Sequence, residues 1–251
     1  MKELLYGIYA LWIYLPLSGL SRKWRQFSRK LRAKQGKLLQ QTTLPSISWK
    51  KCINSKSVKL WEHDKANGNI RISELAVLNL VAQEADDDTN IFEIGTFDGR
   101  TSLNLAFSSP DKCKIYTLDL KPEMDTEYTL ASGERHMVEK KMSGARIEKY
   151  KEMYKHITDK INQLFGDSAK FDFSPYYDSC SLVFVDGSHA YDYAISDTKE
   201  ALKMVKKDGI IIWHDYGIWE GVTKALEEIE SNDKIGLLNI NGTSLVYWKN
   251  E

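Results

Sequence analysis

The 251-residue sequence has few of the residues that cross-link a fold or build a zinc site. Its three cysteines, Cys52, Cys113 and Cys180, are odd in number, far apart and without Cys-x-x-Cys spacing. This argues against a disulfide framework and a zinc site, favours a reducing compartment, and leaves buried, inert thiols as the expectation. Hydrophobic residues at 42% and charged residues at 28% are ordinary globular values, which exclude a disordered, collagen-like or polytopic membrane protein.

Acidic residues are almost absent from the first 60 positions. These positions hold 13 Lys and Arg against one acid, Glu3, and carry +12, whereas the other 191 residues hold 22 basic and 34 acidic side chains and carry −12. Residues 4–21 have no charged side chain and are mostly apolar, and eight Lys or Arg follow between Arg22 and Lys37. The net charge of the whole chain is zero. This value is the sum of two regions of opposite charge, which we expect to face different surroundings.

The uncharged run is compatible with three arrangements. As a helix its 18 residues would reach about 27 Å, just short of a hydrocarbon core. It could span the membrane once, lie in the interface with the basic run on anionic lipid, or pack on its own domain. A signal peptide fits poorly, because the basic charge follows the apolar run and no A-x-A-like cleavage site is present. We expect a cytoplasmic protein attached to the inner membrane face through residues 4–37.

Three regions follow from this pattern: an anchor segment at residues 1–37, a connector with little periodicity at 38–69, and a catalytic domain at 70–251. Nucleic-acid binding is not expected, because no recognised motif accompanies the basic run. The sequence does not predict an oligomeric state.

From residue 70 onward, helical patterns alternate with short β-rich runs. Strands are predicted at NIFEIG, KIYTLDL, SLVFVD and GIIIWHD, and KIGLLNI with SLVYW predicts a terminal hairpin around Asn241-Gly242. Helices are predicted at ISELAVLNLVAQEA, TSLNLAF, YDYAISDTKEALKMVKKDG (ending at Gly209) and GVTKALEEIE. This alternation indicates a mostly parallel, doubly wound α/β sheet, in which ligands bind beyond the carboxyl ends of the strands.

The loop after the first of these strands reads Glu93-Ile-Gly95-Thr-Phe97-Asp-Gly99. A dinucleotide loop needs Gly-x-Gly-x-x-Gly, and Phe97 would place a large side chain where the diphosphate should lie. The two glycines instead suit a cationic sulfonium amino acid lying against the backbone, with Glu93 near its ammonium group. Asp119 lies 24 residues beyond Gly95, close to the spacing of about 20 of a ribose-binding carboxylate.

These residues resemble those of class I S-adenosylmethionine (SAM)-dependent methyltransferases. The blocks are FEIGTFDGRTSLNLA, TLDLKPE, LFGDSAKFDFSP, SLVFVDGSHAYDYAISDTKEALKMVKKDGIIIWHDYG and GVTKALEEI. They look like one bacterial branch, which includes sugar and antibiotic O-methyltransferases and cephalosporin hydroxylase-like proteins. The resemblance covers roughly residues 70–250. It implies a Rossmann-like seven-stranded sheet of order 3-2-1-4-5-7-6, with the last strand antiparallel and helices on both faces.

The resemblance also implies which residues bind SAM. They are Glu93, Gly95 and Gly99 at the methionine end, Asp119 at the ribose hydroxyls, Asp167 and Ser168 at the adenine, and Asp186 beside the methyl group. Transfer to a hydroxyl further requires alignment of the reacting atoms and removal of a proton, by a base or through a metal.

Two histidines follow strands and are candidate bases: His189 in DGSH, and His214 in WHDY beside Asp215. An ordinary hydrogen-bonded histidine is the alternative for each. Some relatives with sugar acceptors bind Mg²⁺ through residues that match Asp186, His214 and Asp215. His214 replaces an acid there, and Mg²⁺ prefers oxygen ligands, which leaves metal dependence open and favours a metal-independent histidine base.

The polar segment 121–154 has no strand pattern and is a candidate acceptor lid, with a solvated helical cap as the alternative. Within it, Tyr128, Arg135 and His136 could hydrogen-bond a sugar-like substrate. We expect methyl transfer from SAM to a hydroxyl of a sugar, glycan or other small metabolite. Two alternatives remain: a non-catalytic SAM-fold binding or scaffold protein at the membrane, and an NAD-dependent oxidoreductase.

Overall fold

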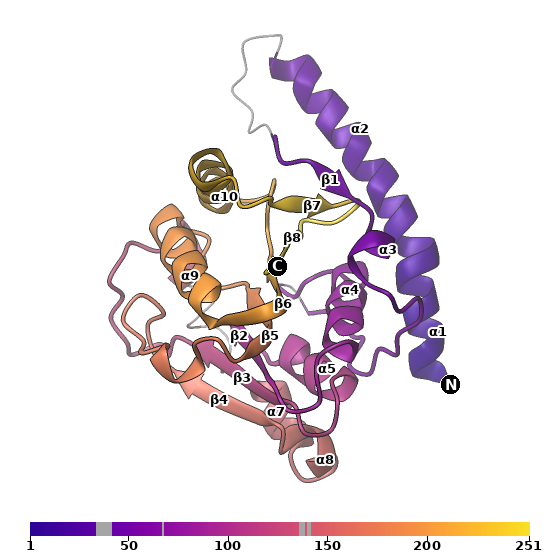
Figure 1. Ribbon diagram of the computed structural model, residues 1–251, viewed down its shortest axis with the longest axis vertical. Helices are drawn as coiled ribbons and strands as arrows, with labels where there is room; N and C mark the ends of the chain where they lie inside the picture. Colours follow the sequence, from indigo (N-terminus) through magenta and orange to yellow (C-terminus); the bar gives the residue numbers. More distant parts are fainter. Residues whose placement is uncertain (34–41, 67, 136–138, 140–141) are drawn as a thin grey trace.

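The computed structural model describes residues 1–33, 42–66, 68–135, 139 and 142–251. Its centre is an eight-stranded sheet of order β1-β7-β8-β6-β5-β2-β3-β4 (Figure 1). The strands are β1 (Ser46–Ile47), β2 (Asn90–Ile94), β3 (Lys114–Asp119), β4 (Ile161–Phe165), β5 (Cys180–Val185), β6 (Val205–Trp213), β7 (Leu238–Ile240) and β8 (Val246–Lys249). Among these described strands, only β8 runs antiparallel to its neighbours, β6 and β7.

The predicted topology is confirmed. Counted from β2 as the first strand, the order from β4 to β7 is 3-2-1-4-5-7-6, and β8 is the antiparallel strand. The terminal hairpin is also present, with Gly242 in its turn at a φ of 83°. Strand β1 adds an eighth member at the edge, parallel to β7. The residue pattern did not reveal β4, because its sequence INQLF mixes polar and apolar residues without alternation.

Helices cover both faces of the sheet. Those from α3 onward are α3 (Trp49–Cys52), α4 (Ile72–Gln83), α5 (Arg100–Ser108), α7 (Ala145–Tyr150), α8 (Lys155–Thr158), the 3-10 turn η2 (Ser174–Tyr176), α9 (Tyr191–Met204) and α10 (Glu220–Asp233). Helices α9 and α10 pack on one face, and α4 and α5 on the other (Figure 1).

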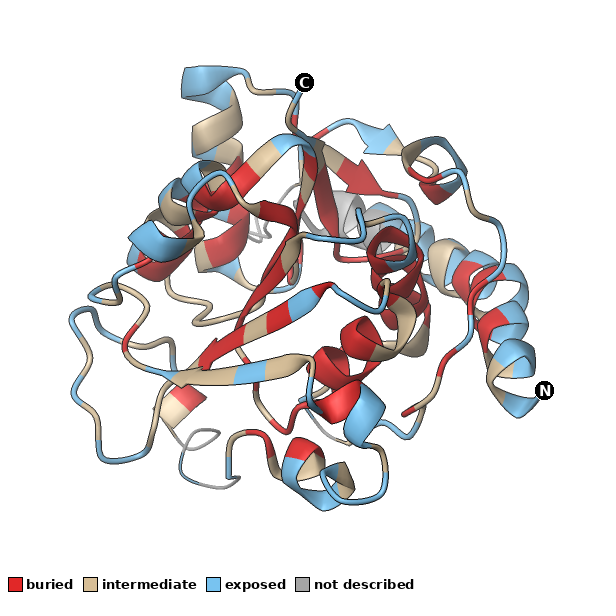
Figure 2. Ribbon diagram, turned by 60° about the horizontal axis from the view of Figure 1, so that its bottom comes forward, coloured by how far each residue is buried: buried red, intermediate tan, exposed pale blue. Residues whose placement is uncertain are grey.

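Strand β5 lies at the centre of both layers. Successive side chains of a strand point to opposite faces, so Leu182 and Phe184 join the α4–α5 core while Val183 and Val185 join the α9–α10 core. All six residues of β5 are buried, as the red centre of Figure 2 illustrates. Burial on both faces explains why this run shows no polar alternation.

The long helix predicted to end at Gly209 ends earlier. Helix α9 stops at Met204, and strand β6 begins at Val205. Pairing between β5 and β6 shifts register between Cys180 and Leu182, which accommodates the extra residues before Gly209. Lysines in this stretch are good helix formers, but sheet pairing outweighs a propensity of a few tenths of a kcal/mol.

The N-terminal residues form one long helix beside the body, made of α1 (Lys2–Ile8), a π-helical stretch η1 (Tyr9–Tyr14) and α2 (Leu15–Ala33). We call this the N-helix. Its inner face is packed: a Cβ on Gly7 would come within 1.8 Å of the Val58 carbonyl oxygen. The π-helical stretch ends just before Pro16, whose ring and missing N–H disfavour regular α-helical bonding.

By length and composition alone, the helix Lys2–Trp24 could cross a membrane. Of its apolar 18-residue stretch, 22% is buried against the protein. The described part of the expected connector is not loose either. From residue 42 onward it supplies β1, α3 and buried side chains such as Trp49, Val58 and Leu60. The N-helix rests partly on these residues, so it and the domain form one packed unit.

Candidate active site

A cavity of about 1040 Å³ lies at the carboxyl ends of the central strands. Its walls include residues that follow β2, β3, β4, β5 and β6 in turn, as a doubly wound sheet predicts. Eight of the predicted site residues line it: Gly95, Asp119, Asp167, Ser168, Asp186, His189, His214 and Asp215. Glu93 and Gly99 do not.

The loop after β2 requires its two glycines. Gly95 has a φ of 103°, and a Cβ there would lie 2.1 Å from the Asp186 carbonyl oxygen. Gly99 has a φ of 86°, and a Cβ there would lie 2.7 Å from Cγ1 of Ile147. Between them Phe97 adopts a positive φ of 50° and lines the cavity. The loop therefore approaches the ligand space through its backbone, without the central glycine that a diphosphate needs.

Glu93 lies beneath this loop. It is fully buried, and its Oε2 accepts hydrogen bonds from Ser102 Oγ and from Thr117 Oγ1 at 2.6 Å. Burial raises the pKa of Glu93 to about 8, against the opposing effect of these hydroxyls. Glu93 does not line the cavity in this position. Glu93 instead ties β2 to β3 and α5 under the loop.

Asp119 connects β3 to the loop. Its Oδ2 accepts the backbone N–H of Phe97 at 3.0 Å, and its Oδ1 accepts that of Leu120 at 2.9 Å. Burial raises the pKa of Asp119, and these hydrogen bonds oppose the shift. The carboxylate thus shapes the loop at the same time as it faces the cavity.

Asp167 follows β4 and is fixed on three sides. Its Oδ1 accepts from the Tyr193 hydroxyl at 2.8 Å and from the Ala169 N–H at 3.1 Å, and its Oδ2 accepts from the Glu127 N–H at 2.6 Å. Ser168 lines the cavity beside it. The β4 end is therefore joined to α9 and to the segment predicted as a lid.

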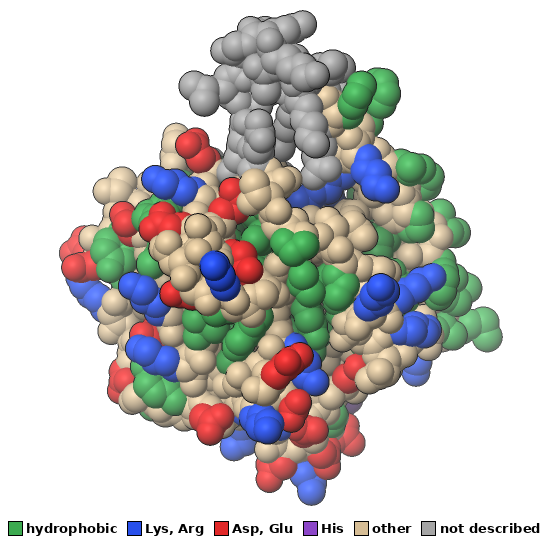
Figure 3. Space-filling model, turned by 45° about the horizontal axis from the view of Figure 1, so that its top comes forward, with side chains coloured by type: hydrophobic (Ala, Val, Ile, Leu, Met, Phe, Trp, Pro, Cys, Tyr) green, Lys and Arg blue, Asp and Glu red, His purple; other side chains and the backbone are tan. Residues whose placement is uncertain are grey.

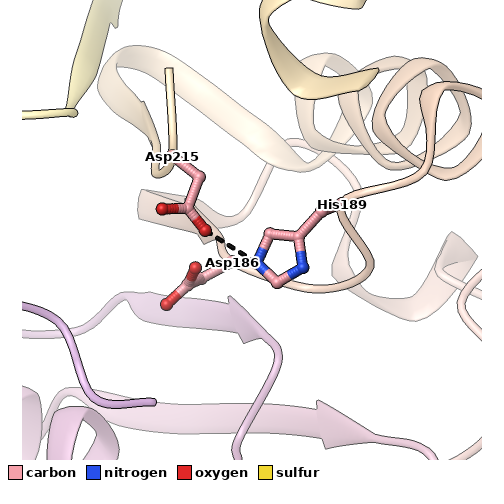
Figure 4. A group of neighbouring side chains, drawn as sticks. All are labelled: Asp186, His189 and Asp215. Carbon is pink, nitrogen blue, oxygen red and sulfur yellow. Dashed lines mark ion pairs between the residues drawn. The ribbon is translucent and has the colours of Figure 1, made fainter. Parts of the chain in front are cut away.

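His189 lies between two carboxylates. Its Nδ1 contacts Glu134 Oε1, and its Nε2 lies 2.7 Å from Asp215 Oδ2 (Figure 4). The Trp219 ring stacks on the imidazole, with centroids 4.4 Å apart and an interplanar angle of 15°. Burial alone would lower the pKa of His189, but Asp215 and Glu134 outweigh it and raise the pKa to about 9. The imidazole is consequently protonated at neutral pH in the absence of ligands.

His214 lies among three carboxylates, with Asp215 Oδ1 3.3 Å from its Nδ1. Its Nδ1 is 2.9 Å from Asp186 Oδ1, and its Nε2 is 3.4 Å from Glu74 Oε2. Burial opposes protonation, but the charges of Asp186 and Asp215 raise the pKa of His214 well above its usual value. Glu74, fully buried in α4, also accepts bonds from the Ser244 N–H and hydroxyl, both at 2.8 Å. His214 is thus held in the wall of the cavity between β6, β5 and α4.

Three residues could hold a divalent cation: Asp186, His189 and Asp215 each offer an atom within 4.8 Å of the others (Figure 4). The expected set was Asp186, His214 and Asp215. His214 is replaced in it by His189, because His214 Nδ1 faces Asp186 and its Nε2 faces Glu74. Two carboxylates and one imidazole do not make the oxygen-rich octahedral site that Mg²⁺ demands. This group does not fit Mg²⁺.

The predicted lid covers one wall of the cavity. Within 121–154, Leu130, Glu134 and Met142 are among the lining residues. Tyr128 and Arg135 do not line it: Tyr128 packs edge-on against Tyr193, and Arg135 donates to the Met124 carbonyl at 3.3 Å. His136 lies outside the described residues.

Sequence reasoning missed several residues that shape the site, chiefly Glu74, Glu134, Trp219 and Arg100. Only Glu74 carried a local signal, as an acid inside an otherwise apolar helix. Arg100 is fully buried and donates to three carbonyl oxygens of residues 62–70, which fixes part of the cavity wall.

Comparison with known proteins assigns this site to a family. Residues 92–216, which contain the loop, Asp119 and the histidine–carboxylate group, match the family model described as a methyltransferase domain. The chain is a class I SAM-dependent methyltransferase. Solved structures share its fold at low identity, and no curated protein matches its sequence.

The methyltransferase can be superposed on several of these structures. The O-methyltransferase NovP is 16% identical over 72% of this chain and 80% of its own, with a TM-score of 0.57. SAH-bound PaMTH1 from Podospora anserina is 16% identical over 72% and 79%, with a TM-score of 0.54. TomG from Streptomyces achromogenes, solved with SAM, is 17% identical over 73% and 82%, with a TM-score of 0.50.

The residues of the methyltransferase fit SAM as its methyl donor. Gly95 lines the cavity without a side chain, so the backbone is open to the methionine portion, and the cavity of about 1040 Å³ has room for the cofactor and a small acceptor.

Proposed function

We propose that this methyltransferase acts on a hydroxyl group of a sugar, glycan or other small metabolite. The observation that carries the proposal is the placement of His189, which faces the cavity and is clamped between Glu134 and Asp215. Bound SAM supplies a methyl group on a positively charged sulfur. What a hydroxyl acceptor additionally needs is a group that takes its proton, and a clamped histidine can do so.

We place the donor along the strand ends. Asp119 would bind the ribose hydroxyls, Asp167 and Ser168 would flank the adenine, and Gly95 would lie against the methionine portion. Asp186 follows β5, between these residues and the histidines, and would lie beside the transferred methyl. Carboxylates around the cavity also favour a cationic ligand.

His189 acts as the base in this mechanism. Glu134 holds the Nδ1 side, so Nε2 is the nitrogen that accepts the proton once an acceptor hydroxyl takes the place of Asp215. A sulfonium cation nearby disfavours a second positive charge, which lowers the histidine pKa from about 9 towards neutrality. His214 is less suited, since it contacts three carboxylates and its Nε2 faces Glu74, which is fully buried.

The test is a transfer assay with methyl-labelled SAM on fractionated cell extract, in buffer with and without EDTA. We expect label in products that resist mild acid and base, as ethers do, and equal rates in both buffers. Label found only in esters, amines or thioethers would refute the hydroxyl assignment. Calorimetry with SAM and NAD addresses the alternatives: binding of SAM without any turnover would favour a scaffold, and binding of NAD alone would favour an oxidoreductase.

We also infer that the N-helix attaches the enzyme to the membrane interface. Its inner face is occupied by the domain, whereas Leu17, Leu20 and Trp24 on its other sides are 61%, 66% and 70% exposed. Figure 3 shows hydrophobic side chains along this edge of the molecule. The apolar side chains of residues 4–21 that the domain leaves exposed would be buried in the interface, and the basic residues from Arg22 onward favour anionic lipid. Flotation with phosphatidylglycerol vesicles tests this: the full chain should float, and a chain lacking residues 1–37 should not.

A further inference from the structure

A second hollow adjoins the catalytic cavity. It has a volume of about 620 Å³ and lies between the N-helix and the domain; we call it the helix groove. Its lining residues are Tyr9, Tyr14, Leu17, Ser18, Ser21, Arg22, Thr42, Arg71, Gly217 and Ile218. Arg71 and Ile218 also line the catalytic cavity, so the two hollows meet at these side chains.

The two hollows differ in charge. Among the described residues that line the helix groove, Arg22 and Arg71 are charged and none is acidic. The catalytic cavity, in contrast, is lined by many carboxylates, among them Asp119, Asp186 and Asp215. An anionic group is therefore favoured in the groove, and a neutral or cationic one in the cavity.

The groove also has apolar walls that lead outward. Tyr9, Leu17 and Ile218 line it and are 45%, 61% and 47% exposed. Leu17 belongs to the helix whose outer face we place at the membrane interface. A hydrocarbon chain in the groove would thus run from the lipid towards the catalytic cavity without crossing water.

We propose that the acceptor is an amphiphile in which a phosphate joins a hydroxyl-bearing head group to a hydrocarbon chain. The head group enters the catalytic cavity, the phosphate lies at the junction near Arg71, and the chain lies in the helix groove. This inference rests on the proposed function, because it assigns a substrate class to the same site. It explains why the helix is docked beside the cavity rather than attached by a free linker.

Binding of farnesyl phosphate, a short isoprenoid phosphate, tests the groove without requiring turnover. The matched variants of the full chain are Leu17→Gln, which changes a groove residue, and Leu20→Gln, which changes a similarly exposed residue of the same helix that does not line the groove. We expect Leu17→Gln to weaken binding about tenfold and Leu20→Gln to change it less than about twofold, a difference of roughly 1.4 kcal/mol. Unchanged SAM affinity shows that each variant is folded.

A third variant, Arg71→Gln, tests whether Arg71 binds the phosphate group. The wild-type enzyme should prefer farnesyl phosphate over farnesol, and this variant should lose that preference. No binding by the wild-type enzyme, or equal losses in Leu17→Gln and Leu20→Gln, would overturn the inference. Label transfer to a water-soluble hydroxyl compound in the same preparation would then show that the proposed function stands without it, whereas absence of transfer to any hydroxyl would count against both.

Discussion

Glu134 accepts hydrogen bonds from both the backbone N–H and the ring Nδ1 of His189. The two residues come from different parts of the chain, since Glu134 belongs to the segment that covers the cavity and His189 follows β5. Ser188 Oγ donates to the same carboxylate at 2.8 Å. Segment 121–154 is therefore joined directly to the proposed catalytic base through one side chain.

Replacing Glu134 by Gln should slow methyl transfer about tenfold to a hundredfold, because the base loses its orienting carboxylate. The affinity for SAM should change little. Glu123→Gln, which alters an exposed acid lining the same cavity, is the matched control and should keep near wild-type rates. Equal effects of the two substitutions on kcat would show that only the general charge of the cavity matters.

The pH profile of the enzyme should follow His189. Its pKa of about 9 in the ligand-free enzyme means that kcat/KM rises with pH up to that value, since only the neutral imidazole accepts a proton. Glu134→Gln removes one of the negative charges that raise this pKa, so the rising limb should move to lower pH. A limb that stays in place in this variant would argue against His189 as the titrating base.

The two histidines should respond differently to substitution. His189→Gln should reduce kcat by about 10²–10⁴-fold, as expected for loss of a general base, and should also lower the melting temperature, because buried Glu134 and Asp215 lose their cationic partner. His214→Gln leaves Glu74 and Asp186 without their buried cationic partner and should destabilise the fold by about 3–5 kcal/mol. Single-turnover transfer, measured well below the melting temperature of each variant, separates the two roles: a larger loss of rate in His214→Gln than in His189→Gln would exchange them.

Asp119→Ala should weaken SAM binding by about tenfold to a hundredfold, or about 1.4–2.7 kcal/mol. The substitution removes the proposed ribose ligand and the acceptor of the Phe97 N–H. Asp172→Ala, a change of an exposed acid in the same domain, serves as the control in calorimetric titrations. SAM affinity equal to that of the wild-type enzyme would exclude Asp119 from the ribose site.

Glu93 should make stability depend on pH. Its folded-state pKa of about 8 lies above that of an unfolded glutamate, so the folded chain binds one more proton and loses stability as pH rises from about 4.5 to about 8. The loss is on the order of a few kcal/mol. Glu93→Gln keeps a neutral side chain at all pH values and should flatten this part of the profile in denaturant titrations. A profile identical to that of the wild-type enzyme would mean that Glu93 is ionised in its buried position.

The sequence by itself determined the parts that follow from local pattern. The apolar run of β5 predicted a strand, and Gly95 and Gly99 predicted a loop whose backbone lies against the ligand. Asp119 and Asp186 were found because the carboxyl ends of parallel strands must meet at one edge of the sheet. These inferences need only side-chain alternation and strand order.

Tertiary structure alone decided how the site is held. Glu74 and Glu134 reach the histidines across 140 and 55 positions of the chain, separations at which no residue spacing indicates contact. The placement of Glu93 under the loop depended on Ser102 and Thr117 reaching it from other elements. The same holds for the N-helix: composition showed that residues 4–21 are uncharged and mostly apolar, but only packing decided which face meets the domain and which face remains exposed.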